Sequence, residues 1–152
     1  MILVRHAHRN KPQGASHDNG LSPKGQKQAI AIQNRFIEQF GKNGKGLLLV
    51  SSPKARCVET IEPIAKLTKV SIFELQELDE GGNLNKKIKD FFLEWVANPP
   101  PLTIACSHGD WIPTALHMIC GAQTDLEKGG WVELDFSVGD QKFQLKWILQ
   151  EV

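Results

Sequence analysis

The sequence has few cysteines and no long apolar run. Its three cysteines, Cys57, Cys106 and Cys120, are too few and odd in number for a disulfide framework, and they favour a reducing compartment. The apolar run from Ile2 to Val4 is far shorter than the core of a secretion signal, and a charge follows it at once. No segment approaches the ~20 apolar residues of a transmembrane helix. We therefore expect a soluble, cytoplasmic protein.

The sequence also lacks an excess of charge of either sign. Its 18 Lys and Arg residues balance 17 Asp and Glu residues, a formal net charge of +1, so nothing favours a nucleic-acid or membrane partner. Repeats, low-complexity tracts and linkers are missing as well. The length of 152 residues fits one domain and is too short for a (β/α)₈ barrel, which needs about 250 residues. We predict a single domain over residues 1–152.

Short apolar runs alternate with helical patterns along the chain, which is typical of an α/β fold. Continuous apolar runs predict buried strands at residues 2–4, 47–50, 70–73 and 102–106. Apolar residues at helical spacing predict helices at residues 23–40, 53–68, 84–97 and 111–120. Partial alternation predicts a terminal hairpin of residues 131–136 and 142–149. The expected architecture is a three-layer domain with a mostly parallel central sheet flanked by helices.

Start and stop signals mark several of these helices. Ser22-Pro23 and Ser52-Pro53 each match an N-cap followed by proline at the first helical position. Gly41 is the expected end of the first helix. Pro63 has no N–H group to donate within the second helix, so we expect a kink or a break there.

Polar residues follow three of the predicted strands at the point where each strand ends. Arg5 and His6 follow the first strand, Arg56 comes shortly after the second, and His108 follows the fourth. Ligands of open parallel sheets bind outside the carboxyl ends of the strands, where helix N-termini also point N–H groups. Two guanidiniums and two imidazoles at this edge suit a doubly charged phosphoryl group. A neutral imidazole could attack phosphorus there while the other groups hold the oxygens.

The same residues lie in four ordered blocks that resemble the histidine phosphatase superfamily, the phosphoglycerate-mutase-like group. Residues 3–7, Leu-Val-Arg-His-Ala, are similar to its Arg-His-Gly signature, and residues 21–29 are similar to its Leu-Thr-x-x-Gly-x-x-Gln-Ala helix start. Residues 51–60 match its Ser-Ser-Pro-x-x-Arg-Ala-x-Gln-Thr block, and residues 107–110 match its second His-Gly block. The resemblance extends from residue 2 to about residue 120.

The resemblance implies a phosphoglycerate-mutase-like fold and a phosphatase that needs neither metal nor cofactor. His6 would be the nucleophile, forming a phosphohistidine that water then hydrolyses. Arg5, Arg56 and His108 would bind the phosphoryl oxygens.

The resemblance also points to a proton donor. The family's donor is an acidic residue in a Leu-x-Glu block followed by glycine, which places Glu77 in that role. Asp79 and Glu80 remain alternatives, because repulsion between neighbouring carboxylates could raise the pKa of any one of the three.

Several positions depart from the family pattern or extend the pocket. Ala7 replaces the glycine after the nucleophile, and we expect that its φ is not positive. Residues 11–13 occupy the region where members with mutase activity carry an asparagine, which favours a phosphatase over a mutase. Arg9, Gly109 and Trp111 are candidates to line the pocket.

The connection between the third and fourth strands, residues 74–101, is short. Larger relatives place insertions there that cover the site, so we expect a minimal cap and an open pocket. This resembles the compact SixA-like phosphatases that act on protein phosphohistidine. An open pocket suits a phosphorylated protein, and it also accepts a small phosphorylated metabolite.

Other functions remain alternatives on the sequence alone. One is a small-molecule phosphomonoesterase of the same superfamily, and another is a non-catalytic phosphate- or phosphoprotein-binding module. The His-x-His pattern of His6 and His8 is compatible with a metal-dependent hydrolase. The further ligands would come from His17-Asp18 and His108-Gly109-Asp110. The sequence is not compatible with a thiolate phosphatase, because no cysteine begins a Cys-x₅-Arg loop.

Overall fold

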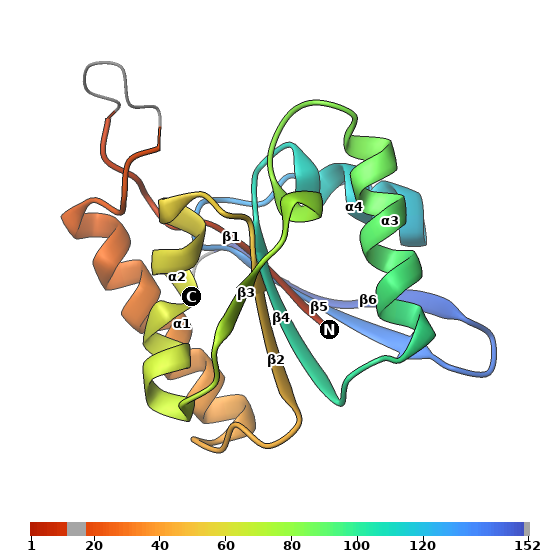
Figure 1. The fold of residues 1–152 in the computed structure, drawn as a ribbon, viewed down its shortest axis with the longest axis horizontal. Helices are drawn as coiled ribbons and strands as arrows, with labels where there is room; N and C mark the ends of the chain where they lie inside the picture. Colours follow the sequence, from red (N-terminus) through yellow and green to blue (C-terminus); the bar gives the residue numbers. More distant parts are fainter. Residues whose placement is uncertain (12–17, 151–152) are drawn as a thin grey trace.

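A mixed sheet with helices on both faces forms the computed structural model of this chain, which describes residues 1–11 and 18–150 (Figure 1). The strands are β1 (Ile2–Arg5), β2 (Leu47–Ser51), β3 (Ile72–Glu74), β4 (Leu102–Ser107), β5 (Trp131–Ser137) and β6 (Lys142–Leu149). The helices are α1 (Pro23–Phe40), α2 (Ala55–Thr68), α3 (Leu84–Ala97) and α4 (Trp111–Cys120), with a short 3₁₀ helix η1 (Gln76–Leu78). The three-layer α/β prediction is confirmed.

The strand order is β3-β2-β4-β1-β5-β6. The first four strands run parallel to one another, whereas β5 is antiparallel to β1 and pairs with β6 in the predicted terminal hairpin. Because β4 lies between β2 and β1, the carboxyl ends of these three strands are neighbours. The residues that follow these strands are therefore brought to one edge of the sheet.

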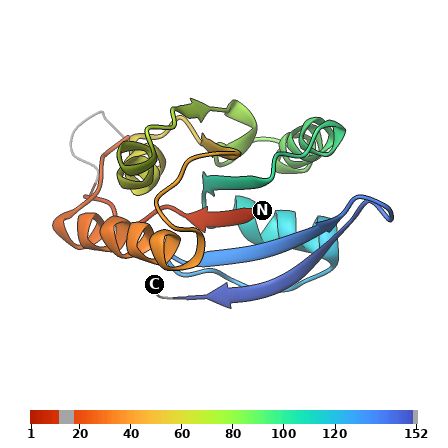
Figure 2. The ribbon, with the colours of Figure 1, turned by 90° about the horizontal axis from the view of Figure 1, so that it is seen from below.

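Each face of the sheet has its own apolar core. Figure 2 shows the sheet and its helices turned by 90° from the view of Figure 1. In β1, Ile2 and Val4 pack in the core beneath α1 and α2, whereas Leu3 packs in the core beneath α3 and α4. Successive strand residues point to opposite faces, so a strand covered on both sides must be apolar throughout. This explains the uninterrupted apolar runs in the sequence.

The N-cap predicted for α1 is confirmed, whereas the N-cap predicted for α2 is not. The hydroxyl of Ser22 accepts the N–H of Gly25 at 3.1 Å, and α1 ends at Gly41, which has a φ of +77°. In contrast, α2 begins at Ala55 after an N-cap residue whose side chain makes no capping bond. The predicted Ser52 cap is therefore wrong, because the Ser52 hydroxyl is bound to His108 instead.

The helix α2 is not broken at Pro63. The helix runs from Ala55 to Thr68 with Pro63 inside it. Ile61 and Ile64 on either side of the proline are fully buried in the core beneath α1, and the Pro63 carbonyl accepts a hydrogen bond from Gln33 of α1 at 2.8 Å. Tertiary packing thus holds the helix together where its own hydrogen bonding is incomplete.

The link between β3 and β4 contains η1 and α3 and no further helix or strand, as the minimal-cap prediction requires. The described part of the chain contains no helix long and apolar enough to cross a membrane.

Gly25 provides a test of how α1 is docked. A Cβ atom on Gly25 would lie 1.9 Å from the backbone carbonyl oxygen of His8. Although alanine is normally favoured over glycine inside a helix, we expect Gly25→Ala to lower the free energy of unfolding in urea by about 1–3 kcal/mol or more. Gly139→Ala, at a turn with open space around the site, is the control. Equal stabilities of the two variants would contradict this packing.

Candidate active site

The ends of β1, β4 and β2 bring His6, His108 and Arg56 together. The N–H of His6 donates to the carbonyl of Ser107 at 3.0 Å, and that of Ser52 donates to Cys106 at 2.9 Å, so the parallel pairing continues into the polar residues. The rings of His6 and His108 lie 5.4 Å apart between centroids, at an interplanar angle of 63°. Both histidines are buried, with 6% and 1% of their surface exposed. The predicted gathering of the two imidazoles is therefore present.

The tautomer of His6 follows from its backbone contact. Its Nδ1 lies 2.8 Å from the carbonyl oxygen of Ala7, which can only accept a hydrogen bond. The proton of a neutral ring therefore sits on Nδ1, and Nε2 carries a lone pair. The chain just beyond is held because the Ala7 N–H donates to the Thr60 hydroxyl at 2.9 Å.

The protonation of His6 is strongly disfavoured. Burial, the Ala7 carbonyl's opposing effect, and the nearby His108, Arg56 and Arg5 together bring the pKa of His6 down to about 3, with burial as the largest cause. At neutral pH the ring is thus neutral and Nε2 is available as a nucleophile.

The two arginines hold unused donors. Arg56 is 1% exposed, and its Nε and Nη1 atoms have no hydrogen-bond partner among the described residues. Arg5 donates to the Leu126 carbonyl at 2.5 Å, while its buried Nε likewise finds no partner in the described part of the chain. Buried donors without partners are rare, because each loses its hydration. Their position beside His6 is suited to an anion that the protein binds.

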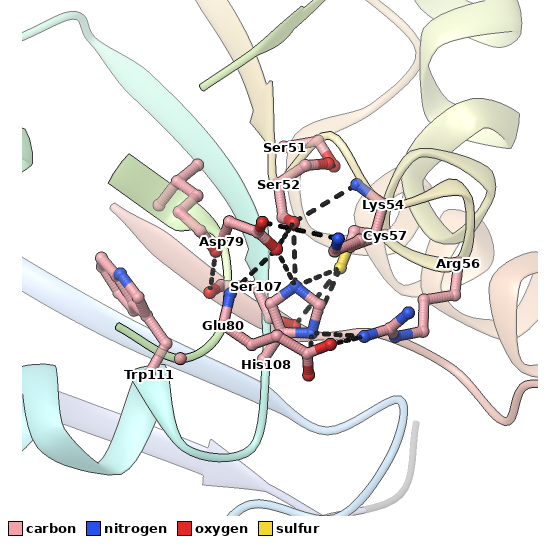
Figure 3. A network of polar contacts seen from close by, with 12 residues as sticks. Ser51, Ser52, Lys54, Arg56, Cys57, Asp79, Glu80, Ser107, His108 and Trp111 are labelled. Atoms are coloured by element: carbon pink, nitrogen blue, oxygen red, sulfur yellow. Dashed lines mark hydrogen bonds and ion pairs between the residues drawn. The ribbon is translucent and has the colours of Figure 1, made fainter. Parts of the chain in front are cut away.

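A serine holds the His108 ring in place. The Ser52 hydroxyl lies 2.8 Å from Nε2 of His108 and 3.1 Å from Oδ1 of Asp79 (Figure 3). If the hydroxyl donates to the carboxylate, it accepts from Nε2–H, and Nδ1 faces Arg56 and Glu80. A second proton on Nδ1 would make it a donor to a phosphoryl oxygen.

Of the three candidate acids, Asp79 and Glu80 contact these groups. Asp79 Oδ1 is 3.5 Å from His108 Nε2, and Glu80 forms ion pairs with Arg56 and with His108. The Glu77 backbone carbonyl accepts the indole N–H of Trp111 at 2.7 Å, and its carboxylate is close enough to Lys86 to contribute to raising the pKa of that side chain, although less than Asp90 does.

The remaining pocket candidates fall in different places. A Cβ on Gly109 would lie 2.6 Å from the guanidinium of Arg5, so the missing side chain makes room for Arg5. Trp111 is fully buried among the aromatic residues of α3, and its place beside the pocket stays a prediction. Arg9 forms an isolated bridge with Leu21 at the start of the loop after β1. Ala7 has no positive φ, as expected.

Three contacts of the site were not predicted from the sequence. One is the Ser52 hydroxyl, whose Ser-Pro context suggested a helix cap. Another is Asp18, which lies 3.9 Å from Arg56 Nη1 and accepts the N–H of Ala55 at 2.8 Å. The third is Cys57, whose sulfur lies 3.5 Å from His108 Nε2. For Cys57, the available signal in the sequence is that it directly follows Arg56.

The pKa values of the two buried thiols, Cys57 and Cys106, are shifted in opposite directions. Burial would raise the pKa of the Cys57 thiol, but Cys106, His108 and Arg56 together lower it. Burial and the contact with Cys57 raise the pKa of Cys106. The charge of Arg56 therefore contributes to the low pKa of Cys57 as well as to that of His6.

The metal-ligand pattern noted in the sequence has no structural counterpart over residues 1–11 and 18–150, where no three His, Cys, Asp or Glu side chains are placed to hold an ion. His17 lies outside the described residues.

Comparison with known proteins yields one family and a set of similar folds. Residues 1–85 match the model of the histidine phosphatase superfamily, branch 1. A search of curated proteins found no match. A mycobacterial glucosyl-3-phosphoglycerate phosphatase in complex with VO₃ is 16% identical, with a TM-score of 0.77 and 96% of each chain covered.

Two further solved structures share the fold. The protein histidine phosphatase SixA in complex with tungstate is 15% identical, with a TM-score of 0.75, covering 98% of this chain and 96% of that chain. A phosphoserine phosphatase mutant from Entamoeba histolytica in complex with phosphoserine is 18% identical, with a TM-score of 0.67, covering 97% and 94%. At these identities the likeness is one of fold.

The low pKa of His6 gives a prediction for stability. Between about pH 6.5 and pH 3 the unfolded chain binds a proton at this ring and the folded chain does not. The free energy of unfolding therefore rises with pH in this window, by up to about 1.4 kcal/mol per pH unit. We expect the parent to lose stability as the pH falls from 6.5 towards 3, and His6→Asn to lose less, as measured by urea unfolding. His117→Asn, which removes an exposed imidazole, is the control. Identical slopes for the parent and His6→Asn would contradict the buried neutral ring.

Proposed function

This chain belongs to the histidine phosphatase superfamily and is a phosphatase, and we propose that it works through a phosphohistidine on His6, without a metal or another cofactor. The observation that carries this proposal is the pairing of an unprotonated, buried Nε2 with two guanidiniums that hold unused donors. A nucleophile and an oxyanion pocket are thereby supplied by the protein itself.

In the first step, the Nε2 lone pair of His6 forms a bond to phosphorus while the bond to the leaving group breaks. Negative charge on the equatorial oxygens is stabilised by Arg5 and Arg56 and by His108 in its protonated form. The imidazole loses no proton in this step, because Nδ1–H remains bound to Ala7 and the ring becomes cationic.

The leaving atom requires a proton unless it departs as a weak base. We keep Glu77, the position that matches the family motif, as the proposed donor, with Asp79 and Glu80 as the alternatives that contact the pocket. In the second step, water attacks phosphorus, the N–P bond breaks, and the water proton passes to the carboxylate that donated before. Phosphate is released and both groups are restored.

For the substrate, we propose a phosphohistidine on a protein. The short β3–β4 connection supports this proposal, because it adds no domain over the pocket and leaves room for a protein surface. A small phosphorylated metabolite is the alternative, and a panel of phosphohistidine peptides and phosphomonoesters separates the two. A protein that binds phosphate but turns over neither class would be a non-catalytic binding module.

Removing the nucleophile should separate chemistry from binding. We expect His6→Ala to abolish hydrolysis of an activated phosphate ester and to prevent trapping of labelled phosphate on the chain, while vanadate still binds weakly. Equal activity of His6→Ala and the parent would refute the proposed nucleophile.

We also expect Arg56→Ala to reduce kcat by roughly 10²-fold or more and to weaken vanadate binding, because a buried donor to the phosphoryl oxygens is lost. Lys66→Ala, on the exposed face of α2, is the control for lost positive charge.

The proton donor can be tested by varying the leaving group. The imidazole of phosphohistidine needs less help from an acid than an alkoxide does. We therefore expect Glu77→Gln to slow hydrolysis of an alkyl phosphate far more than hydrolysis of a phosphohistidine peptide, in single-turnover measurements. Asp79→Asn and Glu80→Gln are measured beside it. If one of these shows the selective loss and Glu77→Gln does not, the donor is that residue.

A further inference from the structure

The carboxylate of Glu80 occupies the position where the proposed function requires phosphoryl oxygens. One of its oxygens is bonded to Nη2 of Arg56, and the other lies 3.4 Å from Nδ1 of His108. Figure 3 shows this carboxylate beside both the guanidinium and the imidazole, which also contact each other at 3.4 Å. Because a carboxylate and a phosphoryl group use the same donors, the two anions compete for this pair.

The backbone that carries Glu80 is held in place. The ammonium of Lys87 donates to the carbonyls of Asp79, Glu80 and Gly81 at 3.1, 3.3 and 3.1 Å. The Gly81 N–H donates to Asp110 Oδ2 at 2.9 Å. The Glu80 side chain is 45% exposed, so it can rotate into solvent while its backbone stays. An entering phosphoryl group would displace the Glu80 carboxylate by rotation of that one side chain. The displaced carboxylate would then remain at the mouth of the pocket.

Other carboxylates surround this mouth, and nearby lysines neutralise their negative charge only in part. Asp79 lies 3.5 Å from His108, and Asp18 lies 3.9 Å from Arg56. Lys54 pairs with Asp79 at 3.7 Å, and the Lys87 ammonium is engaged by backbone carbonyls. A displaced Glu80 therefore adds an unpaired negative charge next to the place of the leaving group.

From this geometry we propose that Glu80 determines substrate specificity by competing with the phosphoryl group for Arg56 and His108 and by repelling anionic leaving groups. The favoured substrates carry a positively charged group beside the phosphoryl group, as phosphorylated basic side chains and amino alcohols do. Those with a carboxylate beside it are disfavoured. This inference rests on the proposed function, because it assigns the pocket to a phosphoryl group.

The competition is tested by titrating inorganic phosphate into the parent, Glu80→Gln and Glu62→Gln in a calorimeter. Glu62 is the matched control, since it is 46% exposed and pairs with Lys66 on the far part of α2. We expect Glu80→Gln to bind phosphate on the order of tenfold more tightly than the parent, and Glu62→Gln to equal the parent. Glu80→Ala, which cannot keep a hydrogen bond to Arg56, should show the same gain, and thermal unfolding shows that each variant is folded. Equal or weaker binding by both Glu80 variants overturns the proposal.

Selection by charge is tested with two substrates of the same length, phosphoethanolamine and phosphoglycolate. We expect the parent to have the higher kcat/KM for phosphoethanolamine, and Glu80→Gln to reduce that preference by roughly tenfold, whereas Glu62→Gln keeps it. An unchanged ratio in Glu80→Gln, or a parent that prefers phosphoglycolate, overturns the selection. If the parent hydrolyses neither compound and forms no phosphohistidine on His6, the proposed function fails, while the phosphate titration still decides whether Glu80 competes for the pocket.

Discussion

The burial of the Arg56 guanidinium is the constraint on which the site depends. A side chain that is always charged and 1% exposed requires negative charge close by, since its hydration is lost. Two of its nitrogens nevertheless lack a hydrogen-bond partner among the described residues, while carboxylates approach it from the rim. The fold thus keeps a cation ready for an anion that arrives from outside. The acidic residues at the mouth compensate the charge until then.

The same charge acts on the groups around it. Together with burial, it keeps the His6 ring neutral, and it adds to the effect of Cys106 and His108, which lower the pKa of the Cys57 thiol. Binding and nucleophilicity are therefore linked, because the cations that would hold the phosphoryl group also discourage a proton on the ring that would attack it. A single cluster at the ends of three strands serves both purposes.

The sequence was a good guide to the layers and a poorer guide to local detail. The alternation of apolar runs and helical patterns predicted the order of elements, because strands covered on both faces must be apolar. It was wrong where a side chain served a distant partner, as with Ser52, which binds His108 instead of capping α2. At Pro63, packing against α1 keeps the helix unbroken, and the aromatic side chains of α3 enclose Trp111. Such outcomes depend on neighbours that are remote in the sequence.

By itself, the sequence determined that the chain is an α/β domain and that Arg5, His6, Arg56 and His108 follow strand ends, since local periodicity and short motifs carry that information. Only the tertiary structure decided which atoms meet. The crossover that inserts β4 between β2 and β1 sets the two imidazoles 5.4 Å apart. The fold likewise placed Glu80, and not Glu77, against Arg56 and His108, although both belong to one short acidic string. The physical reason is that a side chain's direction depends on how its backbone is anchored, here by Lys87 and Asp110, and not on its distance along the chain.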